Sequence, residues 1–375
     1  MQFKPIKSIY IHIPFCKNIC SYCDFCKNYY DKKIVNKYLE ELEKEIKNNY
    51  KNESIKTLYI GGGTPSCLDK DELNKLFNII NSIRLKEDYE FTFECNFEDI
   101  NDELLIYLKE NKVNRLSIGI QTFNDKFKNI LKRDINKEKM IDAIILSKKY
   151  FNNINIDLIY AIFNQSLDDL KNDLEIIKKL DINHISTYSL IIENHTVLKI
   201  NGIKEISDEI QSNMYYYIKN YLEKLGFKHY EISNFSKDGY ESKHNITYWN
   251  NENYYGFGAG ASGFLNNKRY TNTKSVFNYI NGYNKKEYEE LSDNDLLLDE
   301  IMLNLRKIEG INKKDFINKY GNDVSYYFDY DKLRKNKYII ETDKNIMIND
   351  KYLFVSNDII IDFLNSFKEK VDKTM

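Results

Sequence analysis

The chain has 375 residues, which is enough for one large domain and a smaller one. Its 55 basic and 57 acidic residues nearly cancel, so no strong field of one sign favours nucleic acid or a membrane surface as the main partner. No apolar run approaches the roughly 20 residues that a membrane span needs, and no secretory leader precedes Tyr10. We therefore expect a cytoplasmic protein that does not bind nucleic acid, with transient membrane association left open.

Strand and helix patterns alternate through the first half of the chain. Short apolar runs predict strands at 8–13, 57–60, 91–95, 115–118, 154–159 and 184–190. Amphipathic spacing predicts helices at 34–48, from Asp69 through Ile80, and at 102–110, 137–149 and 167–180. Six strands separated by helices predict an α/β fold with a parallel sheet, in which chemistry collects at the strand ends.

The pattern changes after about Asp208, and the chain divides into three predicted regions. A helix at 214–225 is followed by a loop-rich stretch from 230 to 270. Further on, helices are expected at 296–305, 313–320, 323–335 and about 357–371, with a hairpin joining 338–340 to 346–348. We expect a core domain at 1–230, a loop-rich extension at 231–290, and a small α+β domain resembling a winged helix at 291–375.

Three cysteines stand together directly after the first predicted strand. Cys16, Cys20 and Cys23 form the spacing CxxxCxxC, and no second CxxC or His-rich pair follows to complete a four-ligand zinc site. Three thiolates suit a [4Fe–4S] cluster in which one iron has no protein ligand. Buried structural thiols are the alternative, and either reading belongs in a reducing compartment.

This cysteine motif, with Tyr22 before the last cysteine, resembles the radical S-adenosylmethionine (SAM) superfamily. The preceding residues, Tyr10-x-His12-x-Pro14-Phe15-Cys16, are similar to its coproporphyrinogen oxidase-like branch. The resemblance implies a partial (β/α)6 barrel. It also implies a bound [4Fe–4S] cluster and SAM, which the resembling enzymes cleave to methionine and a 5′-deoxyadenosyl radical.

Three consecutive glycines, 61–63, end the second predicted strand and let a ligand approach the backbone. They are not a phosphate loop, because no Gly-Lys-Ser/Thr follows. Taken alone, the charged residues at other strand ends would be read as solvated surface groups. The resemblance instead implies SAM contacts at Tyr10, Tyr22, Phe25, Gly62, Gly63, Thr64, Glu94, Gln121, Arg133 and Asp157.

A second signature lies in the loop-rich extension. Residues 230–235, YEISNF, and 244–249, HNITYW, closely resemble the HemW-type haem chaperones, whose HNxxYW motif is associated with haem binding. The resemblance implies that His244 contacts haem, since His is a common axial ligand of haem iron. From the residues alone, His244 would be read as a loop cap and Trp249 as a core side chain.

The chain departs from the family patterns at three places. Phe25 stands where oxygen-independent coproporphyrinogen oxidases have a further cysteine, Cys26 replaces a usual asparagine, and 161–163 replaces a usual Gly-Leu-Pro. Phe25 favours a haem chaperone with an acceptor protein and an electron donor for its cluster. A radical SAM coproporphyrinogen III oxidase is the alternative, and a scaffold without turnover is a third reading. Enzymatic activity is left open, and no catalytic residue is assigned.

Overall fold

A twisted sheet with a parallel centre forms the frame of the protein, for which a computed structural model describes residues 5–368. Its strand order is β14-β13-β12-β11-β1-β4-β5-β6-β7-β8-β10-β9. The parallel strands are β11 (Tyr254–Phe257), β1 (Ser8–Ile13), β4 (Ile55–Gly62), β5 (Leu85–Asn96), β6 (Arg115–Gln121), β7 (Ile154–Tyr160) and β8 (His184–Ser189). All six strands predicted between residues 8 and 190 are confirmed.

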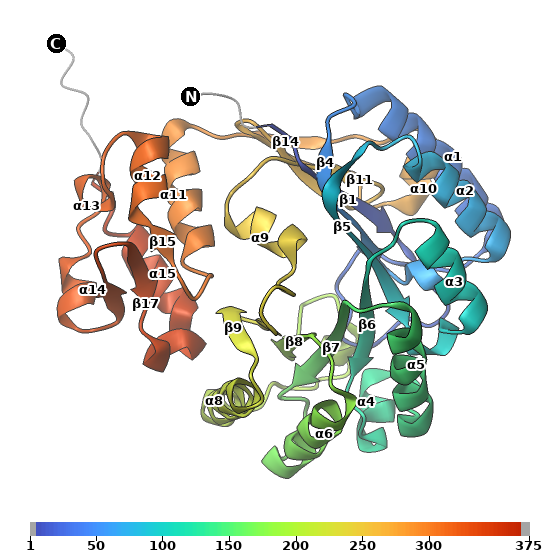
Figure 1. The fold of residues 1–375 in the computed structure, drawn as a ribbon, viewed down its shortest axis with the longest axis horizontal. Helices are drawn as coiled ribbons and strands as arrows, with labels where there is room; N and C mark the ends of the chain where they lie inside the picture. The colour runs from blue at the N-terminus through green and yellow to red at the C-terminus, as the bar shows by residue number, and fades with distance from the viewer. Residues whose placement is uncertain (1–4, 369–375) are drawn as a thin grey trace.

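Helices cover the outside of these strands, as Figure 1 shows. They are α1 (Lys32–Asn49), α2 (Lys70–Ile80), α3 (Asp102–Glu110), α5 (Lys137–Tyr150), α6 (Leu167–Leu180) and α8 (Asp208–Lys224). The start of α2 is a capping box, because Asp69 accepts from the backbone N–H of Glu72 and the Glu72 carboxylate accepts from the N–H of Asp69. The predicted helices are confirmed, and the α/β barrel fold with them.

The segment after α8 contains regular structure where the sequence predicts loops, and that prediction is wrong. It holds β9 (Lys228–Glu231), β10 (Asn234–Ser236), α9 (Lys243–Trp249), β11, β12 (Ser262–Leu265), β13 (Lys268–Thr271), α10 (Val276–Ile280) and β14 (Glu287–Glu290). These strands have three or four residues each, too few for an alternating pattern to show in the sequence. The pairing of β11 with β1 places the segment inside the main sheet. The limits of the three predicted regions stay a prediction.

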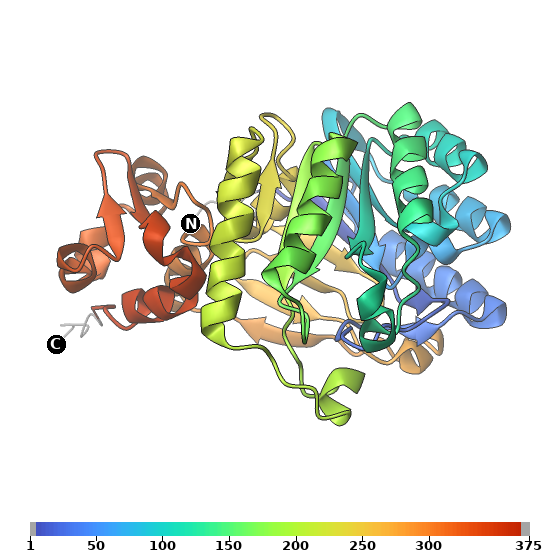
Figure 2. The same cartoon turned by 90° about the horizontal axis from the view of Figure 1, so that it is seen from below.

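The C-terminal part forms a separate group of elements beside α8 (Figure 2). It contains α11 (Asp293–Asn304), α12 (Lys313–Tyr320), α13 (Val324–Tyr327), α14 (Asp331–Lys335), α15 (Ser356–Leu364) and the small sheet of β15 (Ile311–Asn312), β17 (Asn345–Ile348) and β16 (Ile339–Glu341). The predicted hairpin is confirmed as β16–β17. The helix predicted at 323–335 is two short helices, α13 and α14. The helix predicted at about 357–371 is α15, which ends at Leu364, and residues 369–371 of that prediction lie outside the described part. Likeness to a winged helix stays a prediction.

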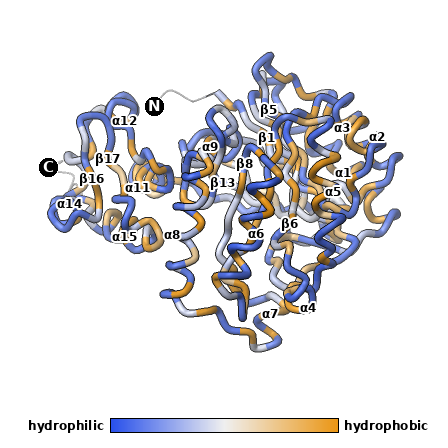
Figure 3. The backbone as a smooth tube through the Cα atoms, turned by 60° about the horizontal axis from the view of Figure 1, so that its bottom comes forward, coloured by the Kyte–Doolittle hydropathy of each residue, from blue (hydrophilic) through white to orange (hydrophobic). Residues whose placement is uncertain are grey.

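The helices alternate between hydrophobic and hydrophilic stretches along their length, as Figure 3 shows. On α1, for example, Val35, Leu39, Leu42 and Ile46 are buried, while Lys37, Glu40 and Lys44 are exposed. Across residues 5–368, we find no helix that is both long and apolar enough to span a membrane.

Candidate SAM and iron–sulfur site

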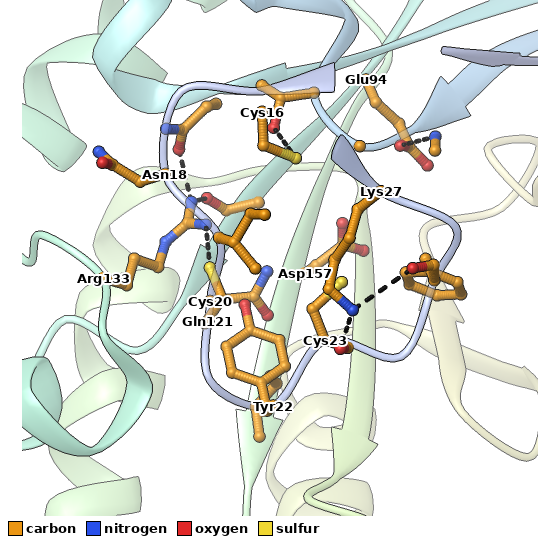
Figure 4. A pocket seen from close by; sticks show the side chains of 18 of the residues that line it. Cys16, Asn18, Cys20, Tyr22, Cys23, Lys27, Glu94, Gln121, Arg133 and Asp157 are labelled. Atoms are coloured by element: carbon orange, nitrogen blue, oxygen red, sulfur yellow. Dashed lines mark hydrogen bonds between the residues drawn. The ribbon is translucent and has the colours of Figure 1, made fainter. Parts of the chain in front are cut away.

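A cavity of about 580 Å³ opens at the carboxyl ends of the parallel strands (Figure 4). The side chains around it come from the cysteine loop and from β4, β5, β6, β7 and β8. The predicted site residues that line it are Cys16, Cys20, Tyr22, Cys23, Phe25, Gly62, Gly63, Thr64, Glu94, Gln121, Arg133 and Asp157. Tyr10 and His244 are the two predicted site residues that do not line it. Residues from positions 16 to 157 therefore meet at one place, as the strand-end pattern predicts.

The cysteine loop is closed at its base by a short parallel pair. β2 (Phe15–Cys16) pairs with β3 (Asn28–Tyr29), so the residues between them form a compact loop over the strand ends. Ser21 fixes its middle, because its backbone N–H donates to the carbonyl of Leu131 at 3.0 Å and its own carbonyl accepts from the N–H of Leu198 at 3.1 Å. These backbone hydrogen bonds anchor the loop to residues 131 and 198.

Two of the three thiols accept hydrogen bonds, which favour negative charge on sulfur. Thr64 Oγ1 donates to Cys16 Sγ at 3.6 Å, and Arg133 Nη1 donates to Cys20 Sγ at 3.8 Å. Burial raises the pKa of the Cys16 thiol to about 11 and also raises that of Cys23. Metal-free thiols at these two positions are therefore protonated at neutral pH, and forming metal–thiolate bonds there releases protons.

The three cysteines have the donor chemistry that a cluster requires. Within the described residues, no three His, Cys, Asp or Glu side chains converge so that they could hold one metal ion. The thiols of Cys16, Cys20 and Cys23 nevertheless line one cavity, and hydrogen-bond donors reach two of them. Three thiols around a shared space are the ligands that a [4Fe–4S] cluster with one open iron requires.

The glycines at the end of β4 are required by close packing against other protein groups. A Cβ on Gly61 would lie 2.7 Å from the carboxyl carbon of Glu94, and one on Gly62 would lie 2.6 Å from the His12 ring. A Cβ on Gly63 would lie 2.7 Å from the carbonyl oxygen of Phe15. The run therefore lets β4 approach both Glu94 and the cysteine loop, and it also leaves the backbone of 62 and 63 open to the cavity.

Two carboxyl groups line the inner wall of the cavity. Glu94 accepts a hydrogen bond from the Tyr59 hydroxyl at 2.7 Å and one from the N–H of Gly62 at 2.9 Å. Asp157 accepts from Asn155 Nδ2 at 2.8 Å and from Ser117 Oγ at 3.3 Å. Enclosure in the barrel raises the pKa of Glu94 to about 7 and raises that of Asp157 as well. A cationic ligand in the cavity would favour the ionised form of both.

Arg133 and Gln121 are positioned by the end of β6. The Arg133 guanidinium donates to the carbonyl of Gly119 and to Asn96 Oδ1, while its buried Nε has no hydrogen-bond partner among residues 5–368. Gln121 has a φ of +70°, in the left-handed region that a residue with a side chain rarely adopts. The strand is irregular between Gly119 and Gln121, and this irregularity turns the Gln121 side chain toward the cavity.

Tyr10 and His12 do not line the cavity, but their side chains support the cysteine loop. The Tyr10 hydroxyl lies 2.9 Å from His12 Nδ1, and His12 Nε2 lies 2.8 Å from the carbonyl oxygen of Cys26. The His12 ring therefore ties the end of the cysteine loop to β1. The Cys26 thiol donates to the carbonyl of Lys274 at 3.1 Å, and burial raises its pKa to about 11, which favours a packing role.

Sequence reasoning missed several residues of the cavity. Tyr59 lines it from the middle of β4. Tyr188, near the end of β8, and Ile191, just after that strand, lie at its mouth. The side chains at the mouth are unusually exposed for apolar residues, at 71% for Phe25, 62% for Ile191 and 43% for Tyr188. Tyr59 could have been found from alternation along β4, since it shares a face with Gly61. No local signal marks the other two.

His244 lies inside the barrel and is 1% exposed. It belongs to α9, and both of its ring nitrogens are in hydrogen bonds, to Thr57 Oγ1 at 2.9 Å and to the Tyr248 hydroxyl at 2.8 Å. Burial lowers the pKa of its imidazole to about 3, so the ring is neutral. The predicted haem contact at His244 stays a prediction, and in this conformation the ring has no free nitrogen.

Residues 10–177 match the model of the Radical SAM superfamily. Over its whole length the chain is similar to a protein of Lactococcus lactis named heme chaperone HemW, with 39% identity covering 97% of this chain and 98% of that one. This chain belongs to the HemW family. A Bacillus subtilis relative, also named heme chaperone HemW, shares 38% identity over 86% of this HemW-family chain and 89% of its own length.

The fold of this HemW-family chain also matches a solved structure. Coproporphyrinogen III oxidase (HemN) from Escherichia coli, a radical SAM enzyme, superposes with a TM-score of 0.84 over 96% of this chain and 90% of that one. Sequence identity is 19%, so the likeness concerns the fold alone. The match of residues 10–177 to the Radical SAM model implies a [4Fe–4S] cluster and SAM, which would supply one-electron chemistry when bound. The three thiols and the cavity beside them fit both groups.

Proposed function

We propose that this chain is a haem chaperone, which binds haem and passes it to an acceptor protein. The observation that carries the proposal is the similarity over almost the entire chain to proteins named heme chaperone HemW, at 39% identity in the first case. The exposed apolar side chains of Phe25, Tyr188 and Ile191 at the cavity mouth support it, since a flat apolar macrocycle packs against such groups.

The proposal includes a cluster held by Cys16, Cys20 and Cys23 and a SAM molecule in the cavity beside it. Three groups would orient SAM there, since each has polar atoms in the cavity lining: Arg133, Glu94 and the backbone of Gly62. It also includes an electron donor for the cluster. His244 is the proposed haem contact, and it reaches the iron only if α9 moves and the ring leaves its hydrogen bonds.

The experiment is an anaerobic titration of the cluster-loaded protein with haem, followed by absorbance, for the wild type and for His244→Ala. We expect saturable binding near one equivalent in the wild type and loss of it in the variant. Adding apomyoglobin to the loaded wild type should then transfer the haem, seen as the absorbance spectrum of the globin complex. Absence of any saturable binding would overturn the proposal.

A radical SAM coproporphyrinogen III oxidase is the second candidate, favoured by the fold that the chain shares with such an enzyme. Phe25 disfavours the oxidase, because the resembling oxidases have a cysteine at this position. Incubation of the reduced, cluster-loaded protein with SAM and coproporphyrinogen III tests this candidate. Formation of 5′-deoxyadenosine together with decarboxylated porphyrin would favour the oxidase, whereas haem binding without either product would favour the chaperone.

A further inference from the structure

Helix α9 joins the barrel interior to the C-terminal group of elements (Figure 1). At its start, the backbone N–H of His244 donates to the buried carboxylate of Glu90 at 3.0 Å. At its end, the Arg306 guanidinium lies 5.8 Å from the Trp249 ring centroid, and Lys307 Nζ donates to Asn250 Oδ1 at 2.8 Å. Both ends are therefore fixed, and the orientation of the His244 ring is fixed with them.

A chain of hydrogen bonds determines which ring nitrogen of His244 carries the proton. Thr247 Oγ1 donates to the carbonyl of Lys243, so its contact with Ser8 Oγ at 3.0 Å needs Ser8 as the donor. Thr57 Oγ1 in turn donates to Ser8 Oγ at 2.8 Å. The Thr57 oxygen can then only accept from the imidazole, which places the proton of His244 on Nδ1.

The other nitrogen, Nε2, therefore accepts the hydrogen bond of the Tyr248 hydroxyl at 2.8 Å. Nε2 carries the lone pair of this tautomer, and a lone pair is what a metal ion needs from a histidine. The Tyr248 hydroxyl therefore occupies the one atom of His244 that could bind iron.

The face of the same imidazole packs on the SAM side of the barrel. Its centroid lies 5.1 Å from that of Tyr59, with the planes tilted by 32°. Tyr59 lines the cavity, and its hydroxyl donates to Glu94, which also holds the N–H of Gly62. The ring of His244 is thus three contacts away from the backbone of Gly62, which faces the cavity.

We propose that His244 is a positioning residue of the SAM site in the haem-free chain: its ring holds Tyr59, and Tyr59 holds the carboxyl group of Glu94. Aromatic pairs of this kind contribute through packing and ring geometry, so the effect belongs to the ring and not to its nitrogens. Loss of the ring leaves Tyr59 without support on that side, and SAM then binds a less ordered cavity wall.

A second consequence rests on the proposed function. When His244 Nε2 binds haem iron, the bond to the Tyr248 hydroxyl breaks and the ring leaves Tyr59. Haem binding therefore weakens SAM binding, and SAM weakens haem binding by the same factor, because coupling between two sites is reciprocal. SAM would in this way favour release of haem to an acceptor.

The first test needs no haem. The dissociation constant of SAM is measured by equilibrium dialysis on the cluster-loaded protein, and the EPR spectrum of the reduced cluster is recorded with and without SAM. We expect His244→Ala to weaken SAM binding by roughly threefold to tenfold. His244→Phe, which keeps a ring against Tyr59, should bind SAM within twofold of the wild type and show its EPR spectrum.

The matched control is His229→Ala, which removes another buried histidine ring that stacks on Phe235 at 4.2 Å, away from the cavity. It should lose stability but keep the SAM affinity of the wild type. Equal SAM affinity in His244→Ala and the wild type would overturn the proposal. So would a His244→Phe variant as weak as His244→Ala. If His244→Ala fails to fold, the SAM affinities of His244→Phe and Tyr59→Ala are compared instead. SAM binding in Tyr59→Ala as tight as in the wild type would then overturn the proposal.

The second test uses the wild type and Tyr248→Phe. Saturating haem should weaken SAM binding in the wild type by the factor lost in His244→Ala. Tyr248→Phe frees Nε2 and should bind haem severalfold more tightly than the wild type. If haem binds while SAM affinity is unchanged, the coupling is overturned and the chaperone function stands. If haem does not bind at all, the proposed function fails, and the haem-free test still decides the role of His244.

Discussion

Gly63→Ala should prevent assembly of the cluster while leaving most of the fold in place. The φ angle of Gly63 lies outside the left-handed region, so its backbone accepts alanine without strain. The obstacle is space, because the new Cβ would lie 2.7 Å from the carbonyl oxygen of Phe15, 2.8 Å from its nitrogen and 2.9 Å from Cys16 Sγ. Two of these three atoms are backbone and cannot rotate away.

The expected size of the effect follows from how β2 is attached. The N–H of Thr64 donates to the carbonyl of Phe15 at 2.8 Å, and the N–H of Gly63 donates to the carbonyl of Ile13 at 2.9 Å. An added methyl group must push these strands apart, and overpacking of a filled interior costs about 1–3 kcal/mol. Since Cys16 is the second residue of β2, the same movement displaces the first cluster ligand.

The assay is anaerobic reconstitution followed by measurement of iron and sulfide per chain, with the free energy of unfolding measured on the metal-free protein. We expect Gly63→Ala to hold less than half of the wild-type iron. The control is Gly321→Ala, where no atom of the described residues lies within 4 Å of the new Cβ but φ is +82°. It should lose about 1 kcal/mol and keep its full cluster. Wild-type iron and unchanged stability in Gly63→Ala would refute the steric reasoning.

Two further predictions concern buried acids. Glu45→Ala should lower the free energy of unfolding by about 3–5 kcal/mol, because the N–H of Gly258 and the hydroxyl of Tyr279 lose their buried acceptor. Glu43→Ala, which removes an exposed side chain of the same helix, should lower it by less than about 1 kcal/mol. Equal losses of the two variants in denaturant titrations would contradict the role of burial. Burial raises the pKa of Glu231 from 4.5 to about 7, so the folded chain keeps a proton that the unfolded chain has lost, and stability falls as pH rises across this interval. Glu231→Gln should therefore gain stability relative to the wild type between pH 5.5 and pH 8, and an unchanged difference would argue against burial as the cause.

The sequence predicted those parts of the fold in which the pattern is local. The strand at Ile154–Tyr160 and the helix at Leu167–Leu180 each have enough residues to show their period, and both match the structure. β11, with the residues Tyr-Tyr-Gly-Phe, is a strand because β1 offers a free edge, and this cause lies almost 250 positions away in the chain. Local pattern cannot show it.

The same distinction applies to the site. The spacing of Cys16, Cys20 and Cys23 is itself local, and it predicted a cluster loop that the structure places on the cavity. The environment of His244 depends on Thr57 and Tyr59, which a distant strand supplies. The family resemblance therefore suggested a ligand without showing that both ring nitrogens are already in hydrogen bonds. The cysteine motif could be recognised in the sequence, whereas the hydrogen bonds of the His244 ring could not.

The place of β1 between β4 and β11 has a consequence for synthesis on the ribosome. β1 carries Ile9, Ile11 and Ile13, and one of its two edges stays unpaired until residue 257 has been made. At roughly 5–20 residues per second, that wait is on the order of tens of seconds. During this time a nascent chain exposes an apolar strand edge, which is the kind of surface that aggregates or recruits a folding chaperone. Slowed translation upstream of residue 254 should therefore lower the yield of folded protein, whereas slowing after residue 290 should not.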